Sequence, residues 1–185
     1  MEQGSDGGAG APGEGGLKAA QGRGDGGPAR PPLDPEVLER LRRSGIRIDR
    51  DGEFQHEGEP VRHEGLRQAL FRWLDRGEDG RTILRLDERR FAYVDVDDTP
   101  LVARSARRDG ERIYLGLSDG SEEALDPETL DVDAAGVMRC RVRGGRLEAR
   151  LTSSAALIVA EGVEGDPSRP VLRLGGRVFP LARRA

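Results

Sequence analysis

Turn signals that contain glycine divide most of this chain into short segments. They occur at Asp51-Gly52, Glu57-Gly58, Asp109-Gly110, Gly144-Gly145 and Gly175-Gly176, between runs in which apolar and polar residues alternate. Such pairs favour antiparallel hairpins, because glycine adopts the positive φ angles that tight turns need. Within the hairpin-rich part, two stretches have the length and apolar content of a helix, about 62–76 and 152–163. The sequence therefore predicts an α+β fold.

The order hairpin, helix, hairpin occurs twice, from about Gly52 to Asp97 and from about Val137 to Leu181. We expect two similar small units, each with antiparallel hairpins packed on one helix, joined by a linking hairpin that starts at Leu101. Gly77 is the expected end of the first helix. Its expected apolar face consists of Leu66, Ala69, Leu70, Trp73 and Leu74.

The N-terminal segment, residues 1–32, is rich in Gly, Ala and Pro and has almost no large apolar side chains, so we expect a disordered tail. A leading helix should follow, capped by Asp34 and stopped by Gly45. Ile46 and Ile48 alternate with charges, as in an edge strand. The expected division is a tail over 1–32, an N-terminal α+β unit over 33–100, and the linking hairpin with a C-terminal α+β unit over 101–185.

Composition excludes several classes of protein. The net charge of −4 argues against general binding to nucleic acid. A single cysteine, Cys140, excludes an internal disulfide and a multi-cysteine zinc site. The sequence has neither an apolar run long enough for a membrane span nor the pattern of a secretory signal. We therefore expect a cytoplasmic protein without a membrane segment.

Three carboxylates lie close together at Asp95, Asp97 and Asp98. On a strand, Asp95 and Asp97 share one side while the neighbouring valines share the other, which is typical of a half-buried strand. Asp98 precedes Thr99-Pro100, where a turn carboxylate accepts backbone N–H bonds. Structural roles therefore account for all three aspartates without a bound ligand. The alternative is a site for a hard cation held by carboxylate oxygens.

Arg139, Arg141 and Arg143 alternate along a predicted strand and form a basic stripe, which Arg146 and Arg150 continue. Such a stripe suits a phosphorylated ligand or an acidic partner, although charged faces are common on solvated strands. The expected ligand-binding residues are the three aspartates together with the first three arginines of the stripe.

The other reactive residue types have ordinary structural interpretations. His56 and His63 do not have zinc-ligand spacing, and His63 suits a helix start. Cys140 lies on the apolar side of its strand, and Thr152, Ser153 or Ser154 is the candidate helix cap. The sequence therefore predicts no catalytic residues, no metal site and no cofactor.

Several motifs occur in an order that resembles the bacterial family named domain of unknown function 1285 (DUF1285). They are "DGEFQHEGEPV", "LRQALFRWL", "DGRTILRL", "VDVDDTPLV", "LSDG", "RLEARLTSSAALIV" and "LRLGGRVFPL". Leu101 stands where the family usually has Phe, and Phe54 where it more often has Trp. The resemblance covers about Ile46 to Leu181. It implies a two-part α+β fold and a suggested role in signal transduction, and it supplies no catalytic residues.

These observations give three hypotheses for the function. The first is a non-enzymatic module that binds a protein or a small-molecule ligand. The second is a metal-dependent hydrolase or phosphoester-processing enzyme that uses the segment from Asp95 to Asp98, with His56 or His63. The third is a structural adaptor with the N-terminal tail as a tether. The partner itself is not predicted.

Overall fold

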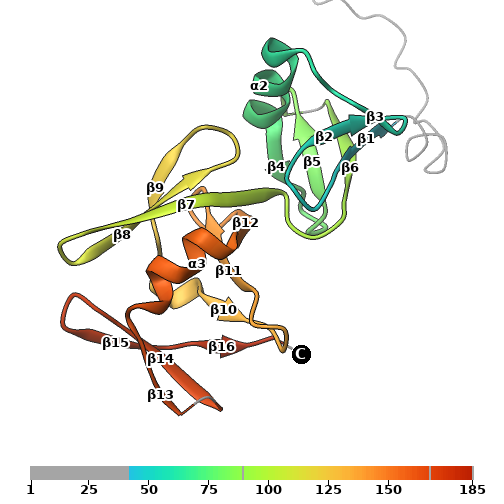
Figure 1. Cartoon of the computed structure of the whole chain (residues 1–185). Helices are drawn as coiled ribbons and strands as arrows, with labels where there is room; N and C mark the ends of the chain where they lie inside the picture. Colours follow the sequence, from blue (N-terminus) through green and yellow to red (C-terminus); the bar gives the residue numbers. More distant parts are fainter. Residues whose placement is uncertain (1–41, 89, 167, 185) are drawn as a thin grey trace, which may run out of the picture. The chain divides into compact units, whose positions relative to one another are not determined.

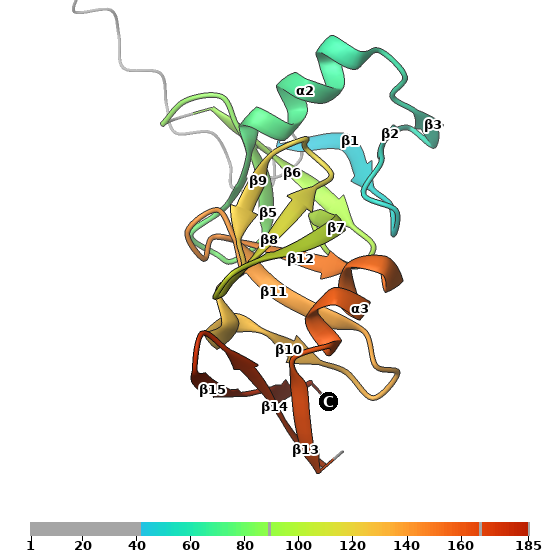
Figure 2. The ribbon, with the colours of Figure 1, turned by 60° about the vertical axis from the view of Figure 1, so that its left-hand side comes forward.

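The computed structural model describes residues 42–88, 90–166 and 168–184. These residues form two mixed sheets, a small three-stranded sheet and two α-helices (Figures 1 and 2). The prediction of an α+β fold is therefore confirmed. The predicted disordered tail and the first part of the leading helix lie outside the described residues. No helix in the described part is long and apolar enough to cross a membrane.

The first sheet has the strand order β3-β2-β1-β6-β5-β4. Its strands are β1 (Arg43–Ile48), β2 (Phe54–His56), β3 (Glu59–Pro60), β4 (Leu74–Arg76), β5 (Thr82–Arg85) and β6 (Phe91–Val96). β1 pairs with β2 in antiparallel and with β6 in parallel orientation, so it lies inside the sheet. The expectation of an edge strand at Ile46 and Ile48 is wrong, because the parallel partner comes from far along the chain.

Gly45 lies within β1 and has a φ angle of 66°. The pairing of β1 with β6 is irregular between Arg43 and Arg47, and glycine tolerates the backbone conformation that this irregularity needs. The expectation that the leading helix continues to Gly45 is therefore wrong from Arg43 onward.

Helix α2 (Glu64–Trp73) begins where the sequence predicts it and ends earlier. The side chain of His63 caps it by accepting a hydrogen bond from the backbone N–H of Leu66 at 3.2 Å. Leu74 already belongs to β4, and Gly77 lies in the turn to β5, where its N–H donates to the carbonyl of Arg81 at 2.8 Å. Pairing with β5 therefore ends the helix.

This earlier end changes which side chains of α2 are buried. Leu70 and Phe71 face the core, and Phe71 meets Phe54 edge to face with ring centroids 4.7 Å apart. Leu66 and Trp73, which were expected on the apolar face, are partly exposed. Phe71 was not predicted as a core residue.

The second sheet has the order β16-β10-β11-β12-β7-β8-β9. Its strands are β7 (Leu101–Asp109), β8 (Arg112–Leu117), β9 (Glu122–Ala124), β10 (Asp131–Val132), β11 (Met138–Val142), β12 (Leu147–Leu151) and β16 (Ala182–Arg183). A 3₁₀ turn, η1 (Pro127–Thr129), precedes β10. The hairpins with tips at Asp109-Gly110 and Gly144-Gly145 form as predicted. Strand β7 pairs in parallel with β12, so the linking hairpin is part of this sheet.

Helix α3 (Ser153–Ala160) follows β12, and Thr152 caps it by accepting a hydrogen bond from the N–H of Ala155. The chain then forms the three-stranded sheet β13 (Val163–Asp166), β14 (Arg169–Leu174) and β15 (Arg177–Pro180). Both units thus place a helix between a hairpin and a three-stranded antiparallel run. In the first unit that run, β4 to β6, joins the sheet, whereas in the second it forms a sheet of its own.

Most buried hydrophobic residues of the described part form one cluster that extends from Ile48 to Leu181. It includes side chains of both helices, such as Phe71 of α2 and Val159 of α3. Ile83 is only 1% exposed, yet it lies outside this cluster. The division of the chain at residues 100 and 101 remains a prediction.

Candidate functional site

Asp98 links the end of β6 to the second sheet. Its Oδ1 accepts hydrogen bonds from Nη2 of Arg139 at 2.9 Å and from Nε at 3.2 Å. Its Oδ2 lies 3.2 Å from Nε of Arg150 as an ion pair. The side chains of Asp98 and Arg139 are only 19% and 11% exposed. The acidic segment and the basic stripe, which are separate candidates in the sequence, therefore meet in one network.

Arg139 also binds Asp133, which sequence reasoning missed. Its Nη1 donates to Oδ2 of Asp133 at 2.8 Å, and this hydrogen bond lowers the pKa of the Asp133 carboxyl below its usual range. Burial alone lowers the pKa of Arg139, but the hydrogen bonds to Asp133 and Asp98 outweigh it and raise that pKa. The guanidinium is thus held charged between two carboxylates.

Thr99 extends the network into the buried backbone. Its side chain is 1% exposed, and its hydroxyl donates to the carbonyl of Leu101 at 2.7 Å. The same oxygen accepts from the N–H of Arg150 at 3.1 Å. The segment between β6 and β7 is therefore fixed by Asp98 and Thr99 together.

We expect Thr99→Val to lower the free energy of unfolding by about 1 to 2 kcal/mol, because the partly buried N–H of Arg150 and the carbonyl of Leu101 lose their hydrogen bonds to the hydroxyl. Urea denaturation measures the change. Thr99→Ser keeps the hydroxyl and is the matched control. Equal losses in both variants would mean that packing, and not the hydrogen bonds, stabilises this segment.

Asp97 and Asp95 lie apart from Asp98. The guanidinium of Arg47 donates from Nε to Oδ1 of Asp97 at 2.5 Å, and this bond raises the pKa of Arg47. Asp95 is exposed and lines a hollow with Arg43. Asp97 and Asp98 thus face arginines. Within the described residues, no three His, Cys, Asp or Glu side chains come together in a way that could hold a metal ion.

The basic stripe does not form one cationic surface. Arg139 faces Asp98, and Arg141 is exposed. Arg143 lies in the turn after β11 with a φ angle of 53°, so the expectation that it continues the strand is wrong. Its Nη2 donates to Oδ2 of Asp119 at 2.6 Å. Its backbone N–H donates to Oε1 of Glu123 at 2.8 Å.

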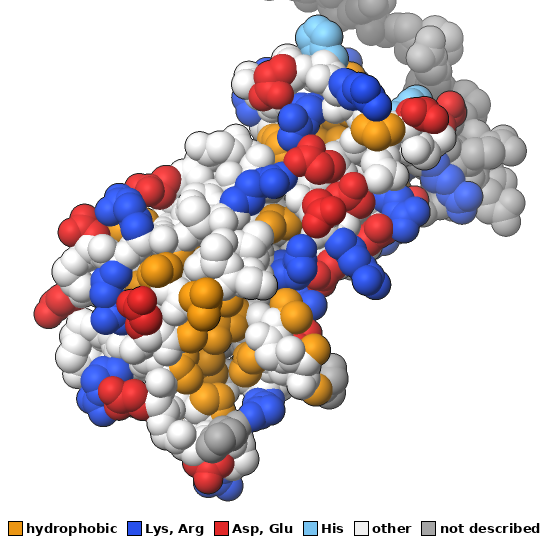
Figure 3. Space-filling view, viewed as in Figure 1, with side chains coloured by type: hydrophobic (Ala, Val, Ile, Leu, Met, Phe, Trp, Pro, Cys, Tyr) orange, Lys and Arg blue, Asp and Glu red, His pale blue; other side chains and the backbone are white. Residues whose placement is uncertain are grey.

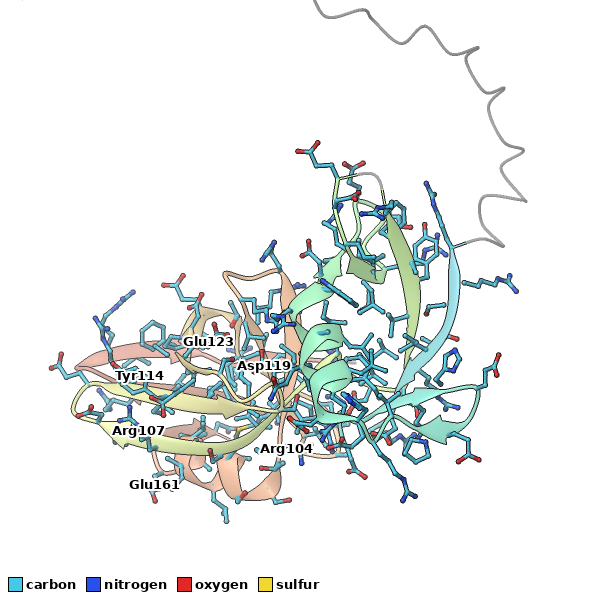
Figure 4. All side chains as sticks on the ribbon, turned by 90° about the horizontal axis from the view of Figure 1, so that it is seen from above. Arg104, Arg107, Tyr114, Asp119, Glu123 and Glu161 are labelled. Carbon is cyan, nitrogen blue, oxygen red and sulfur yellow. The ribbon has the colours of Figure 1, made fainter. Side chains whose placement is uncertain are left out.

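A second paired cluster lies on hairpin β7–β8 and strand β9 (Figure 4). Arg107 donates to both oxygens of Glu122, at 3.0 and 2.7 Å, and these bonds raise its pKa. The same guanidinium lies 4.4 Å from the ring centroid of Tyr114. These contacts are cross-strand pairs on one face of the sheet, so the side chains have a structural role.

The remaining candidates have structural roles. His63 caps α2, and Thr152 caps α3. Cys140 is 1% exposed, and burial raises its pKa to about 12, so the thiol is not a nucleophile at neutral pH. Ser154 donates from its hydroxyl to the carbonyl of Arg104 at 3.3 Å.

Helix α3 presents a surface that sequence reasoning missed. Its residues, SSAALIVA, include no charged side chain, and only Ala155 and Val159 are buried. Leu157 is 68% exposed. Figure 3 shows apolar side chains gathered on the face of the molecule where α3 and β14 lie. Glu161 lies at the C-cap of the helix (Figure 4). At its start, Ser154 contacts the backbone carbonyl of Arg104, whose guanidinium pairs with Glu53 at 2.5 Å.

Comparison with known proteins shows what this fold is similar to. No family model matches the sequence, and no curated protein matches it. A crystal structure of a DUF1285 family protein from Silicibacter pomeroyi DSS-3 superposes with a TM-score of 0.62 and 23% identity, covering 76% of this chain and 80% of that one. A DUF1285 family protein from Shewanella baltica OS155 gives a TM-score of 0.48 and 17% identity over 58% and 84%.

The first of these structures shows that this chain has a DUF1285-like fold. This first neighbour belongs to the family that the ordered motifs indicate, so the resemblance is confirmed at the level of the fold. The comparison with these neighbours provides no reaction, ligand or partner. The function must therefore be argued from the surfaces of this chain.

Proposed function

We propose that this chain is a non-enzymatic protein-binding module and that the exposed face of α3 is its contact surface. One observation carries the proposal: α3 has the composition of a buried helix, yet the fold fully buries only two of its side chains. A helix that is apolar on all sides is normally buried, and exposed apolar patches mark sites of association.

The chemistry of the surface indicates the kind of partner. Its centre is Leu157, with Ala156 and Ile158 partly exposed and Ala160 exposed beside it. Small residues beside one large side chain suit a shallow apolar groove on another protein. Glu161 at the C-terminal end would fix the direction in which α3 enters it, because the guanidinium of Arg104 is already paired with Glu53. We therefore expect a partner whose groove is apolar and carries a basic residue at the end that meets Glu161.

The enzyme hypothesis has less support. It needs Asp97 or Asp98 to meet histidines or other carboxylates, and both face arginines instead. The cytoplasmic location remains a proposal. The role in signal transduction, which the family resemblance implies, also remains a proposal. The adaptor hypothesis is compatible with the α3 surface, but its tether lies outside the described residues.

The test places a photo-crosslinking amino acid at the exposed Ala160 of the full chain in its native cell. We expect one crosslinked protein, which is then purified and titrated against the chain by calorimetry. Because Leu157 is the central exposed side chain, Leu157→Asp should remove the crosslink and weaken binding by at least about tenfold. The thermal midpoint should not change, since Leu157 is 68% exposed.

Val178→Asp is the matched control, because Val178 is 48% exposed on β15 and outside this surface. It should leave the crosslink and the affinity unchanged. Equal binding by wild type and Leu157→Asp would refute the proposal. Sedimentation of the purified chain tests self-association, and a dimer that Leu157→Asp dissociates would replace the separate partner by a second copy.

A further inference from the structure

A hollow of about 200 Å³ lies beside the turn between β4 and β5. Val96, Pro100 and Leu147 give it an apolar wall, in which Pro100 and Leu147 are buried. The polar side chains that line it are those of Arg76, Thr82, Asp98, Arg146 and Glu148. The volume is below the range of about 300 to 1,000 Å³ that is typical of sites for drug-sized ligands. The hollow therefore suits a ligand of few atoms.

The pairing of β4 with β5 places two of these polar groups on one face of the hairpin. Arg76 and Thr82 are directly opposite each other, so their side chains leave the sheet on the same side. Gly80 in the turn has a φ angle of 81°, and a Cβ atom at this position would lie 3.3 Å from Nη2 of Arg76. The guanidinium of Arg76 therefore lies against the glycine of the turn, where it lines the hollow.

The two carboxylates that line the hollow are already paired with other arginines. Asp98 pairs with Arg139 and Arg150. Glu148 accepts hydrogen bonds from Arg184 at both of its oxygens. These pairs neutralise the carboxylates, so the arginines of the hollow are its available charges.

These two arginines are only partly used by the fold. Nη1 of Arg146 lies 3.2 Å from Oδ1 of Asp75, and Arg85 donates to the other oxygen of the same carboxylate. In the part of the chain that the structure describes (42–88, 90–166 and 168–184), the guanidinium of Arg76 forms no hydrogen bond or ion pair. The hollow thus has one unpaired cation and a second cation whose carboxylate is shared.

We propose that this hollow binds a small phosphate monoester, in which the phosphate is attached to a short carbon skeleton. The phosphate oxygens accept hydrogen bonds from the guanidinium groups of Arg76 and Arg146, whose planar geometry suits phosphate, and from the hydroxyl of Thr82. The carbon skeleton packs on the apolar wall. The lining residues come from β4, β5, β6, β12 and the turns beside them, so this site is separate from the α3 surface.

Charge and size favour this class over other anions. A phosphate monoester carries a charge of about −1.5 to −2 at pH 7, which suits two guanidinium groups better than a single carboxylate does. A nucleotide base has no room beside the phosphate in a hollow of about 200 Å³. A nucleic acid would bring further phosphates to Asp98 and Glu148, whereas nucleic-acid sites need a continuous basic track.

The test titrates the isotope-labelled full chain by NMR with propyl phosphate, inorganic phosphate, propanol and AMP. We expect propyl phosphate to bind most tightly, because only this probe uses the arginines and the apolar wall and also fits the volume. The perturbed amides should be those of residues 76–82 and 146–148. Arg76→Ala should weaken the binding by at least about tenfold through loss of charge-assisted hydrogen bonds. Its thermal midpoint should not change, because the guanidinium has no partner to lose.

Arg72→Ala is the matched control, because Arg72 is exposed on α2 and lies outside the hollow. It should leave the affinity unchanged. Thr82→Val keeps the shape of the side chain and removes its hydroxyl, so it should weaken binding less than Arg76→Ala does. The proposal is overturned if propyl phosphate does not bind at millimolar concentration or if Arg76→Ala binds it as wild type does. Equal affinity for inorganic phosphate, or tighter binding of AMP, would also overturn it.

Discussion

Asp98→Asn should lower the free energy of unfolding by about 2 kcal/mol, between the small effect of a surface ion pair and the larger effect of breaking a buried one. The substitution keeps the shape of the side chain and removes its charge. Arg139 is then left 11% exposed with Asp133 as its remaining carboxylate, and Arg150 loses its ion pair. Urea denaturation followed by circular dichroism measures the change.

The neighbouring aspartates provide the control for this prediction. Asp95→Asn should leave stability unchanged, because Asp95 is exposed. Asp97→Asn should have only a small effect, since its partner Arg47 is 57% exposed. Equal effects at all three positions would mean that the charge of the segment matters and that the network at Asp98 does not. The three variants therefore distinguish the structural carboxylate of Asp98 from the carboxylates of Asp95 and Asp97.

Gly162→Ala should destabilise the fold by about 2 kcal/mol through overpacking. Gly162 is buried after α3, and its carbonyl accepts a hydrogen bond from the N–H of Arg173 at 2.7 Å. A Cβ atom at this position would lie 2.9 Å from the carbonyl oxygen of Arg173 and 3.0 Å from Cδ1 of Leu172. The backbone of β14 would have to move, which disturbs its contact with the end of α3.

Gly65→Ala makes the same chemical change where only a side chain, and not the backbone, would have to shift. Gly65 is exposed in α2, and the nearest atom to a new Cβ is Cε1 of the His63 side chain at 3.2 Å. Alanine favours a helix over glycine by up to about 1 kcal/mol, so this variant should be as stable as wild type or more stable. Thermal denaturation of both variants checks the contrast. A stable Gly162→Ala protein would show that β14 does not approach α3 as closely as the structure has it.

The sequence by itself determined the local structure. Glycine pairs place the hairpin tips because positive φ angles are a local requirement, and the tips at Asp109-Gly110, Gly144-Gly145 and Gly175-Gly176 occur as predicted. Helix starts depend on nearby caps, so α2 and α3 begin close to their expected positions. The alternation along β11 correctly places Cys140 in the core.

Only the tertiary structure decided the contacts between distant segments. The parallel pairing of β1 with β6 and the ion pairs of Asp98 join residues that no local periodicity relates. The end of α2 at Trp73 depends on the pairing of β4 with β5. The exposure of α3 has the same origin, because composition predicts a buried helix and only the packing of the other elements determines how much of it they cover.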